Sequence, residues 1–141
     1  ASAKLVTLSN IFPMTRATKI LHTFDYVSML LQKSSKTIMK RESDNENRIH
    51  LYGVGQYWAA FDKSAYLLEK MTNEESDTTI LHFKDYPFPI LMYCLHYEKV
   101  KDICRKHIMA KQNSDYLQLL THPIDPKSYS QWYRELVVDE D

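Results

Sequence analysis

The residues best placed to contact a ligand follow the only two glycines of the chain, Gly53 and Gly55. Glycine adopts backbone conformations that other residues avoid, so a tight turn or a close approach to another molecule is expected around Val54. Two aromatic residues, Tyr57 and Trp58, come directly after this turn. Their rings either stack on a ligand or pack beneath the neighbouring elements, and the sequence leaves both alternatives open.

Basic side chains are concentrated in two parts of the chain. Residues 1–41 hold seven lysines and arginines against one acid, and residues 96–111 hold five against two. The whole chain is neutral, with 18 basic and 18 acidic residues, which argues against a protein that coats nucleic acid nonspecifically. The two basic segments either form one face that contacts phosphate or are the solvated sides of two helices.

The sequence gives little support for catalysis or metal binding. It has no Gly-Lys-Ser/Thr run, and no third glycine completes a dinucleotide fingerprint. Cys94, His96, Cys104 and His107 resemble a zinc set, but His96 and His107 would lie roughly 16 Å apart on one helix, too far to share an ion. A cysteine nucleophile with a histidine base has no local signature here. We therefore predict a noncatalytic protein with no cofactor and no metal.

The elements that must position these residues follow from the spacing of apolar side chains. Helices are expected over about residues 17–40, 57–72, 96–110 and 127–137, and strands over residues 48–54, 78–83, 90–95 and 115–120, with residues 5–8 as a short strand or an arm. The segment 90–95 is apolar on both faces, as a central strand covered on two sides requires. The sequence therefore predicts a layered α/β fold with helices on both faces of a sheet.

Residues 51–65 resemble the start of the mismatch-recognition domain, domain I, of the MutS family. That family's motif reads hydrophobic–Gly–Asp–Phe–Tyr–Glu–x–Phe/Tyr and is followed by an alanine-bearing helix. The matching positions are Val54, Gly55, Tyr57, Trp58, Phe61 and Ala65. Further along, Pro87-Phe88-Pro89 and His96-Tyr97 are similar to the family's proline-containing strand and to its entry into the next helix. The resemblance covers residues 48–120.

This resemblance implies a mixed β-sheet of about four to five strands flanked by helices on both faces. Residues 48–120 would form the α/β core. Residues 1–47 would be an N-terminal arm, basic helix and polar connection packed on it, and residues 121–141 a loop, short helix and acidic tail. In the family the aromatic residue after the glycine wedges beside a mispaired base. Here Ala59 and Gln56 stand where the family has its glutamate and aspartate.

The sequence thus predicts a noncatalytic nucleic-acid-binding module. The expected contact residues are Gly55, Gln56, Tyr57 and Trp58 at the turn, with Lys33, Lys36, Lys40 and Arg41 on phosphate. A protein-interaction or regulatory domain is the alternative, because ten tyrosines are many for 141 residues and tyrosine is enriched in interface cores.

A cytoplasmic location without a membrane span is also expected. The longest apolar stretch, residues 88–95, is less than half the length that a bilayer crossing needs. The two cysteines form no CxxC pair and fit a reducing compartment. The expected partners are therefore DNA or another nucleic acid, or a protein, and not a membrane.

Overall fold

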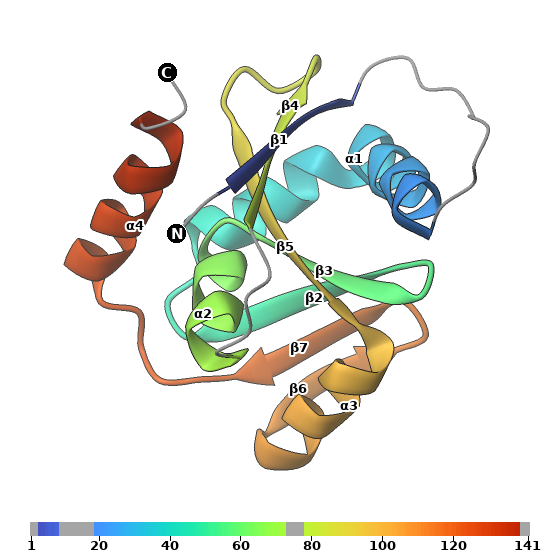
Figure 1. Ribbon diagram of the computed structural model, residues 1–141. Coiled ribbons are helices and arrows are strands. Elements are labelled where there is room, and N and C mark those ends of the chain that lie inside the picture. The colour runs from blue at the N-terminus through green and yellow to red at the C-terminus, as the bar shows by residue number, and fades with distance from the viewer. Residues whose placement is uncertain (1–2, 9–18, 73–77, 139–141) are drawn as a thin grey trace.

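The computed structural model describes residues 3–8, 19–72 and 78–138. Within these ranges seven strands form one sheet in the order β1-β4-β5-β3-β2-β7-β6 (Figure 1). The strands are β1 (Ala3–Leu8), β2 (Arg48–Val54), β3 (Tyr57–Phe61), β4 (Thr78–Phe83), β5 (Ile90–His96), β6 (Met109–Asn113) and β7 (Tyr116–Leu120). Strands β1 and β4 are parallel, and the other neighbouring pairs are antiparallel. The mixed sheet is as expected, but it is wider than the four to five strands predicted.

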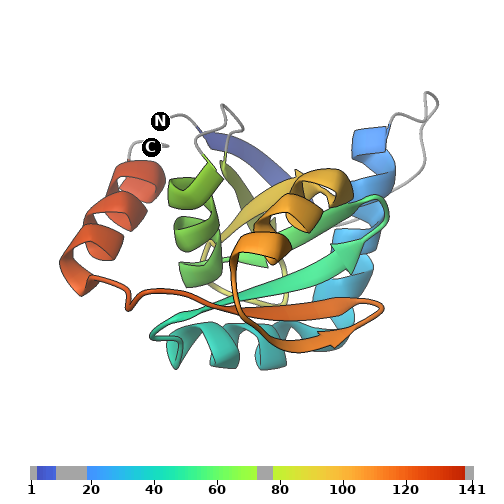
Figure 2. The same ribbon diagram turned by 90° about the horizontal axis from the view of Figure 1, so that it is seen from below.

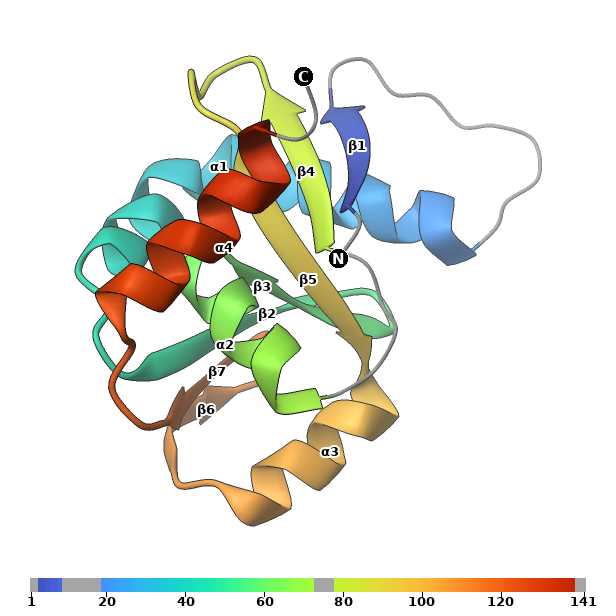
Figure 3. The ribbon, with the colours of Figure 1, turned by 60° about the vertical axis from the view of Figure 1, so that its left-hand side comes forward.

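Four helices cover the sheet in the described part of the chain. They are α1 (Lys19–Ser43), α2 (Lys63–Thr72), α3 (Tyr97–Lys106) and α4 (Pro126–Val138). Helix α1 lies on one face, whereas α2 and α4 lie side by side on the other (Figure 3). Helix α3 packs on the same face as α2, over the region where β3 and β5 meet (Figure 2). The predicted helices on both faces are confirmed.

The core consists of two layers separated by the sheet. On one face Val27, Leu31 and Ile38 of α1 are fully buried in the same cluster as Phe61 of β3. On the other face the cluster joins residues from two helices and four strands, namely Ala65, Leu68, Val100, Tyr93, Ala60, Ile49, Leu51, Leu117 and Leu119. Strands β2, β3 and β5 are therefore apolar on both sides because they are covered on both sides.

The helix predicted to begin at Tyr57 is wrong in its first part. Residues Tyr57–Phe61 form strand β3, and α2 begins at Lys63. Tyr57 and Phe61 are four residues apart, a spacing that puts two side chains on one face of a strand as well as of a helix. Only Asp62, with a φ of +51°, separates strand from helix. The apolar pattern therefore runs through both elements without a break.

The helix predicted over residues 96–110 is too long. Helix α3 ends at Lys106, and residues Met109–Asn113 form β6, an edge strand that pairs with β7. This strand has no apolar alternation, because four of its five residues are exposed. Its extended conformation is set by pairing with β7. The strand propensity of its own residues does not reveal this pairing.

Several expectations fall partly outside the described residues. The start of the first helix at residue 17 and the acidic tail, residues 139–141, cannot be compared with the structure. Residues 5–8, expected to be a short strand or an arm, are part of strand β1. This strand extends the sheet beyond β4.

A buried carboxylate ties the end of α1 to the start of α2. Glu42 is fully buried, and one of its oxygens accepts a hydrogen bond from the Ser64 backbone N–H at 2.9 Å. The Ser64 hydroxyl donates to the other oxygen at 2.6 Å, and the Asn45 amide donates to the first at 3.3 Å. Burial raises the pKa of Glu42 from its ordinary 4.5 to about 7. This carboxyl therefore changes charge near neutral pH.

Candidate nucleic-acid interface

The glycine turn is a two-residue β-hairpin loop between β2 and β3. Val54 pairs with Tyr57, so Gly55 and Gln56 are the two loop residues. Gly55 has a φ of +74°, which is typical of the glycine at the first central position of a type II′ turn. Gln56 is exposed, and its carbonyl accepts the backbone N–H of Tyr97 at 3.0 Å. The turn therefore connects directly to the first residue of α3.

The two aromatic rings after the turn point to opposite faces of the sheet. Tyr57 packs against the core on the α1 side, with its ring edge-on to His96 at a centroid distance of 5.5 Å. Trp58 packs against the core on the α2 and α3 side. Successive residues of a strand must alternate in this way. Both rings are partly buried. Because they face opposite sides of the sheet, they cannot stack together on one ligand group.

The predicted cations on α1 extend away from the turn. Tyr26 of α1 touches the turn, since a Cβ on Gly55 would lie 3.2 Å from its ring. Lys40 lies fourteen residues further along the helix, about 21 Å away at 1.5 Å per residue. The side chains of Lys33, Lys36, Lys40 and Arg41 are all exposed. The structure therefore does not gather them with the turn into one cluster.

Within the part of the chain that the structure describes, the two basic segments do not share one face. Helix α1 packs on one side of the sheet and α3 on the other. Each helix instead carries its basic residues on its own solvated side, which is the second alternative.

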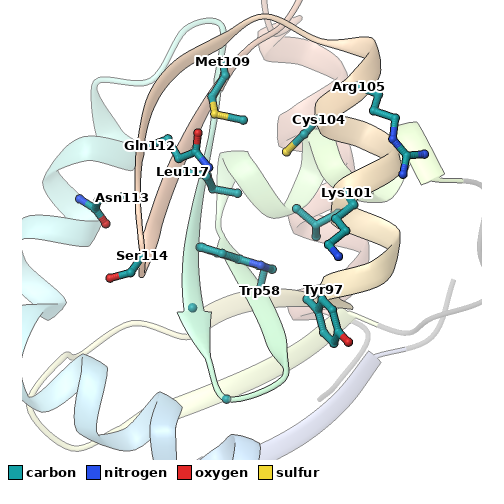
Figure 4. A pocket seen from close by; sticks show the side chains of 13 residues that line it. Trp58, Tyr97, Lys101, Cys104, Arg105, Met109, Gln112, Asn113, Ser114 and Leu117 are labelled. Atoms are coloured by element: carbon teal, nitrogen blue, oxygen red, sulfur yellow. The ribbon is translucent and has the colours of Figure 1, made fainter.

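A groove of about 600 Å³ opens between α3 and the β6–β7 hairpin. Trp58 lies in the space between the two walls (Figure 4). Tyr97, Lys101 and Arg105 project from α3, while Gln112, Asn113 and Ser114 lie on the hairpin side (Figure 4). Gly53 pairs with Trp58 across the strands, and a Cβ there would lie 3.7 Å from the indole ring. Of the predicted contact residues, Gly55 and Trp58 line this groove.

The groove is basic because Lys101 and Arg105 line it and none of its lining residues carries a carboxylate. The Lys101 ammonium lies 5.3 Å from the centre of the Tyr97 ring. Arg105 pairs with the Asp102 carboxylate at 2.6 Å, but both side chains are mostly exposed. Exposed ion pairs contribute at most about 1 kcal/mol, so a phosphate can replace Asp102 at little cost.

No family model, curated protein or solved structure matches this chain. Its function must therefore be argued from the groove and from the residues around it. None of the helices in the described ranges has the length and apolar character that crossing a membrane requires.

Burial disfavours the thiolate form of both cysteines. Burial raises the pKa of Cys94 to about 12 and also raises the pKa of Cys104, which lines the groove. A thiol with a raised pKa is a poor nucleophile and a poor metal ligand. Within residues 19–72 and 78–138 no three histidine, cysteine or acidic side chains are grouped so as to hold a metal.

Sequence reasoning did not select the groove residues Tyr97, Lys101, Arg105, Gln112 and Asn113. The basic side of residues 96–111 was visible in the sequence, with Lys101 and Arg105 outside the apolar stripe. What was missing was β6, because the hairpin that it forms with β7 creates the second wall.

Proposed function

We propose that this protein is a noncatalytic module that binds nucleic acid in the groove between α3 and the β6–β7 hairpin. The observation that carries the proposal is the combination of two aromatic rings, two cations and two amide side chains in one groove without a carboxylate. Aromatic rings stack on bases of any sequence, cations contact phosphate, and amides bond base edges. The resemblance to the MutS recognition domain supports the same class of ligand and remains part of the proposal.

The groove favours an unpaired base over a paired one. Trp58 is partly buried between two walls, so a base must leave its own stack to reach the indole ring. Unstacking costs least in a single strand or beside a mismatch. Single-stranded DNA and mismatched duplexes should therefore bind more tightly than a matched duplex.

Fluorescence anisotropy with short labelled DNA at several salt concentrations tests this proposal. Lys101→Ala should weaken single-strand binding and reduce its salt dependence by about one counterion. Lys106→Ala is the matched control, because Lys106 is also exposed on α3 but does not line the groove. Trp58→Leu should weaken binding by roughly 5- to 150-fold, the equivalent of about 1–3 kcal/mol for one stacked base.

A double variant of α1 distinguishes the groove from the contact surface expected from the sequence. Lys33→Ala with Lys36→Ala should change affinity much less than Lys101→Ala does, because α1 lies on the opposite face. If the double variant of α1 weakened binding more than Lys101→Ala does, the contact surface would lie on α1. Absence of binding at low salt to every DNA form would refute the proposal.

A protein partner is the second candidate function, favoured by an exposed apolar pair on α1. Tyr26 and Met29 are 50% and 65% exposed and lie three residues apart, so they share one side of the helix. Tyr26 also covers the Gly55 turn. If this surface binds a protein, Met29→Glu should abolish that complex and leave DNA binding unchanged.

A further inference from the structure

A second hollow, of about 370 Å³, lies on the α1 face beside the end of that helix. Its lining includes Arg41 of α1, Arg48 and His50 of β2, and Gln118 of β7. Asp44 and Glu46 of the connection after α1 also line it. The hollow shares no lining residue with the groove, which lies on the opposite face of the sheet.

A chain of hydrogen bonds holds the His50 ring in place. The Arg48 guanidinium donates to Gln118 Oε1, so the Gln118 amide nitrogen is the donor to the Tyr116 hydroxyl at 2.8 Å. The Tyr116 hydroxyl is hydrogen-bonded to His50 Nδ1 at 2.7 Å. In the tautomer in which Tyr116 donates to Nδ1, the neutral imidazole carries its proton on Nε2.

The His50 ring is uncharged at neutral pH. Burial, together with the positive charges of Arg41 and Arg48, lowers the pKa of His50 to about 4. Nε2 makes no hydrogen bond to the described residues, and no buried side-chain nitrogen or oxygen among them lacks a partner. His50 is only 6% exposed and lines the hollow, so the small exposed part of its ring faces that space.

The Arg41 guanidinium is positioned by uncharged groups. It donates to the Tyr52 hydroxyl at 3.1 Å and lies 4.7 Å from the centre of the Tyr116 ring. Within the described residues neither Arg41 nor Arg48 forms an ion pair, and Asp44 pairs with Lys40 at 3.1 Å. Two guanidinium groups are therefore held in place with their charges unpaired.

We propose that this hollow binds the phosphate group of a small ligand, either inorganic phosphate or a phosphomonoester. Two guanidinium groups are donors that match the oxygens of a phosphate dianion, and His50 Nε2–H is a third donor in the tautomer in which Tyr116 donates to Nδ1. The carboxylates of Asp44 and Glu46 also line the hollow and repel any anion, a long polyanion such as a nucleic-acid strand more than a single phosphate group. The pairing of Asp44 with Lys40 offsets one of these two charges. The proposal is independent of the function assigned to the groove.

Titration of the full chain with inorganic phosphate, followed by NMR of the His50 ring, tests this site. A bound dianion should shift the His50 resonances and raise the pKa measured for this ring, because it offsets the two arginine charges. Arg41→Gln and Arg48→Gln should each weaken phosphate binding about tenfold or more, as expected for a lost charge-assisted hydrogen bond. Arg134→Gln on α4 is the matched control, because Arg134 is exposed and lines neither the hollow nor the groove, and it should bind phosphate normally.

Parallel titrations with phenyl phosphate and sodium chloride complete the experiment. Tighter binding of phenyl phosphate than of inorganic phosphate identifies an organic phosphate as the ligand, and equal affinity identifies phosphate itself. His50 resonances that respond to phosphate no more than to chloride would overturn the proposal. An unchanged phosphate affinity in Arg48→Gln, with a normal thermal unfolding profile, would also overturn it.

Discussion

At the scale of single residues, Gly55 is the position that depends most on its own chemistry. Its φ of +74° lies in the left-handed region, and a side chain would also press on the Tyr26 ring at 3.2 Å. We expect Gly55→Ala to lower the free energy of unfolding by about 1–2 kcal/mol, the usual cost of a left-handed conformation in an L-residue. Urea unfolding monitored by circular dichroism measures this difference.

Gly53→Ala is the natural control for that experiment. Gly53 has no positive φ, and a Cβ there would meet its nearest neighbour, Asp115 Cα, at 3.4 Å, an ordinary contact. Gly53→Ala should therefore change the free energy of unfolding by less than about 0.5 kcal/mol. Equal losses in both variants would show that turn conformation is not what makes Gly55 necessary.

At the scale of elements, the sequence predicts best those segments whose own pattern decides their structure. Strands Arg48–Val54 and Thr78–Phe83 have the predicted bounds, and Ile90–His96 is longer by one residue. Strand β3 could have been recognised by the criterion used for β5, because residues 57–61 are an unbroken apolar run after a glycine turn. Strand β6 could not, since its exposed polar residues are ordered only by pairing with β7.

The candidate site, too, is predictable from the sequence only where the signal is local. The sequence identified the turn and Trp58, because glycine spacing and adjacent aromatic residues are local signals. It could not show that Tyr57 and Trp58 face opposite sides, because that requires residues 57–61 to be a strand. The walls of the groove come from segments about ten residues apart that meet only once α3 has turned into β6.

Helix α4 provides a prediction about how a whole element is held. Leu136 is buried against Ile80 and Leu91, and the Trp132 indole N–H donates to Glu69 at 3.0 Å. We expect Leu136→Ala to cost about 2–4 kcal/mol, since it leaves a cavity between helix and sheet. Hydrogen exchange should then become faster in α4 before it does in β5.

The exposed Arg134 on the same helix supplies the control for this change. Arg134→Ala should alter the free energy of unfolding by no more than about 0.5 kcal/mol. If Leu136→Ala were equally mild, α4 would not be anchored by its apolar side.

At the scale of the whole molecule, the sheet separates two places where basic side chains line a depression in the surface. The groove beside α3 and the hollow beside the end of α1 have no lining residue in common. The two proposed ligands would therefore not compete for a side chain. Neither Lys101→Ala nor Trp58→Leu should affect the phosphate titration of the hollow.

The response of stability to pH is also a property of the whole molecule, because two buried groups act in opposite directions. The pKa of Glu42 is raised to about 7, so its contribution is fully present below 4.5 and is lost as the pH rises through 7. The pKa of His50 is lowered to about 4, so its contribution is present above 6.5 and is lost as the pH falls through 4. Between pH 4.5 and 6.5 the two effects oppose each other. The free energy of unfolding of the wild type therefore varies less with pH in this range than either group alone would cause.

Glu42→Gln separates the two contributions, because the amide keeps the shape of the side chain and cannot ionise. His50 is present in both proteins, so its effect cancels in the difference between them. The free energy of unfolding of the variant, relative to that of the wild type, should rise by up to about 3 kcal/mol between pH 4.5 and about pH 8, which is the value of moving this pKa from 4.5 to about 7. Urea unfolding at several pH values gives this difference directly. A difference that stays constant across the range would mean that Glu42 is already ionised at low pH in the folded protein, and that the bonds from Ser64 and Asn45 outweigh its burial.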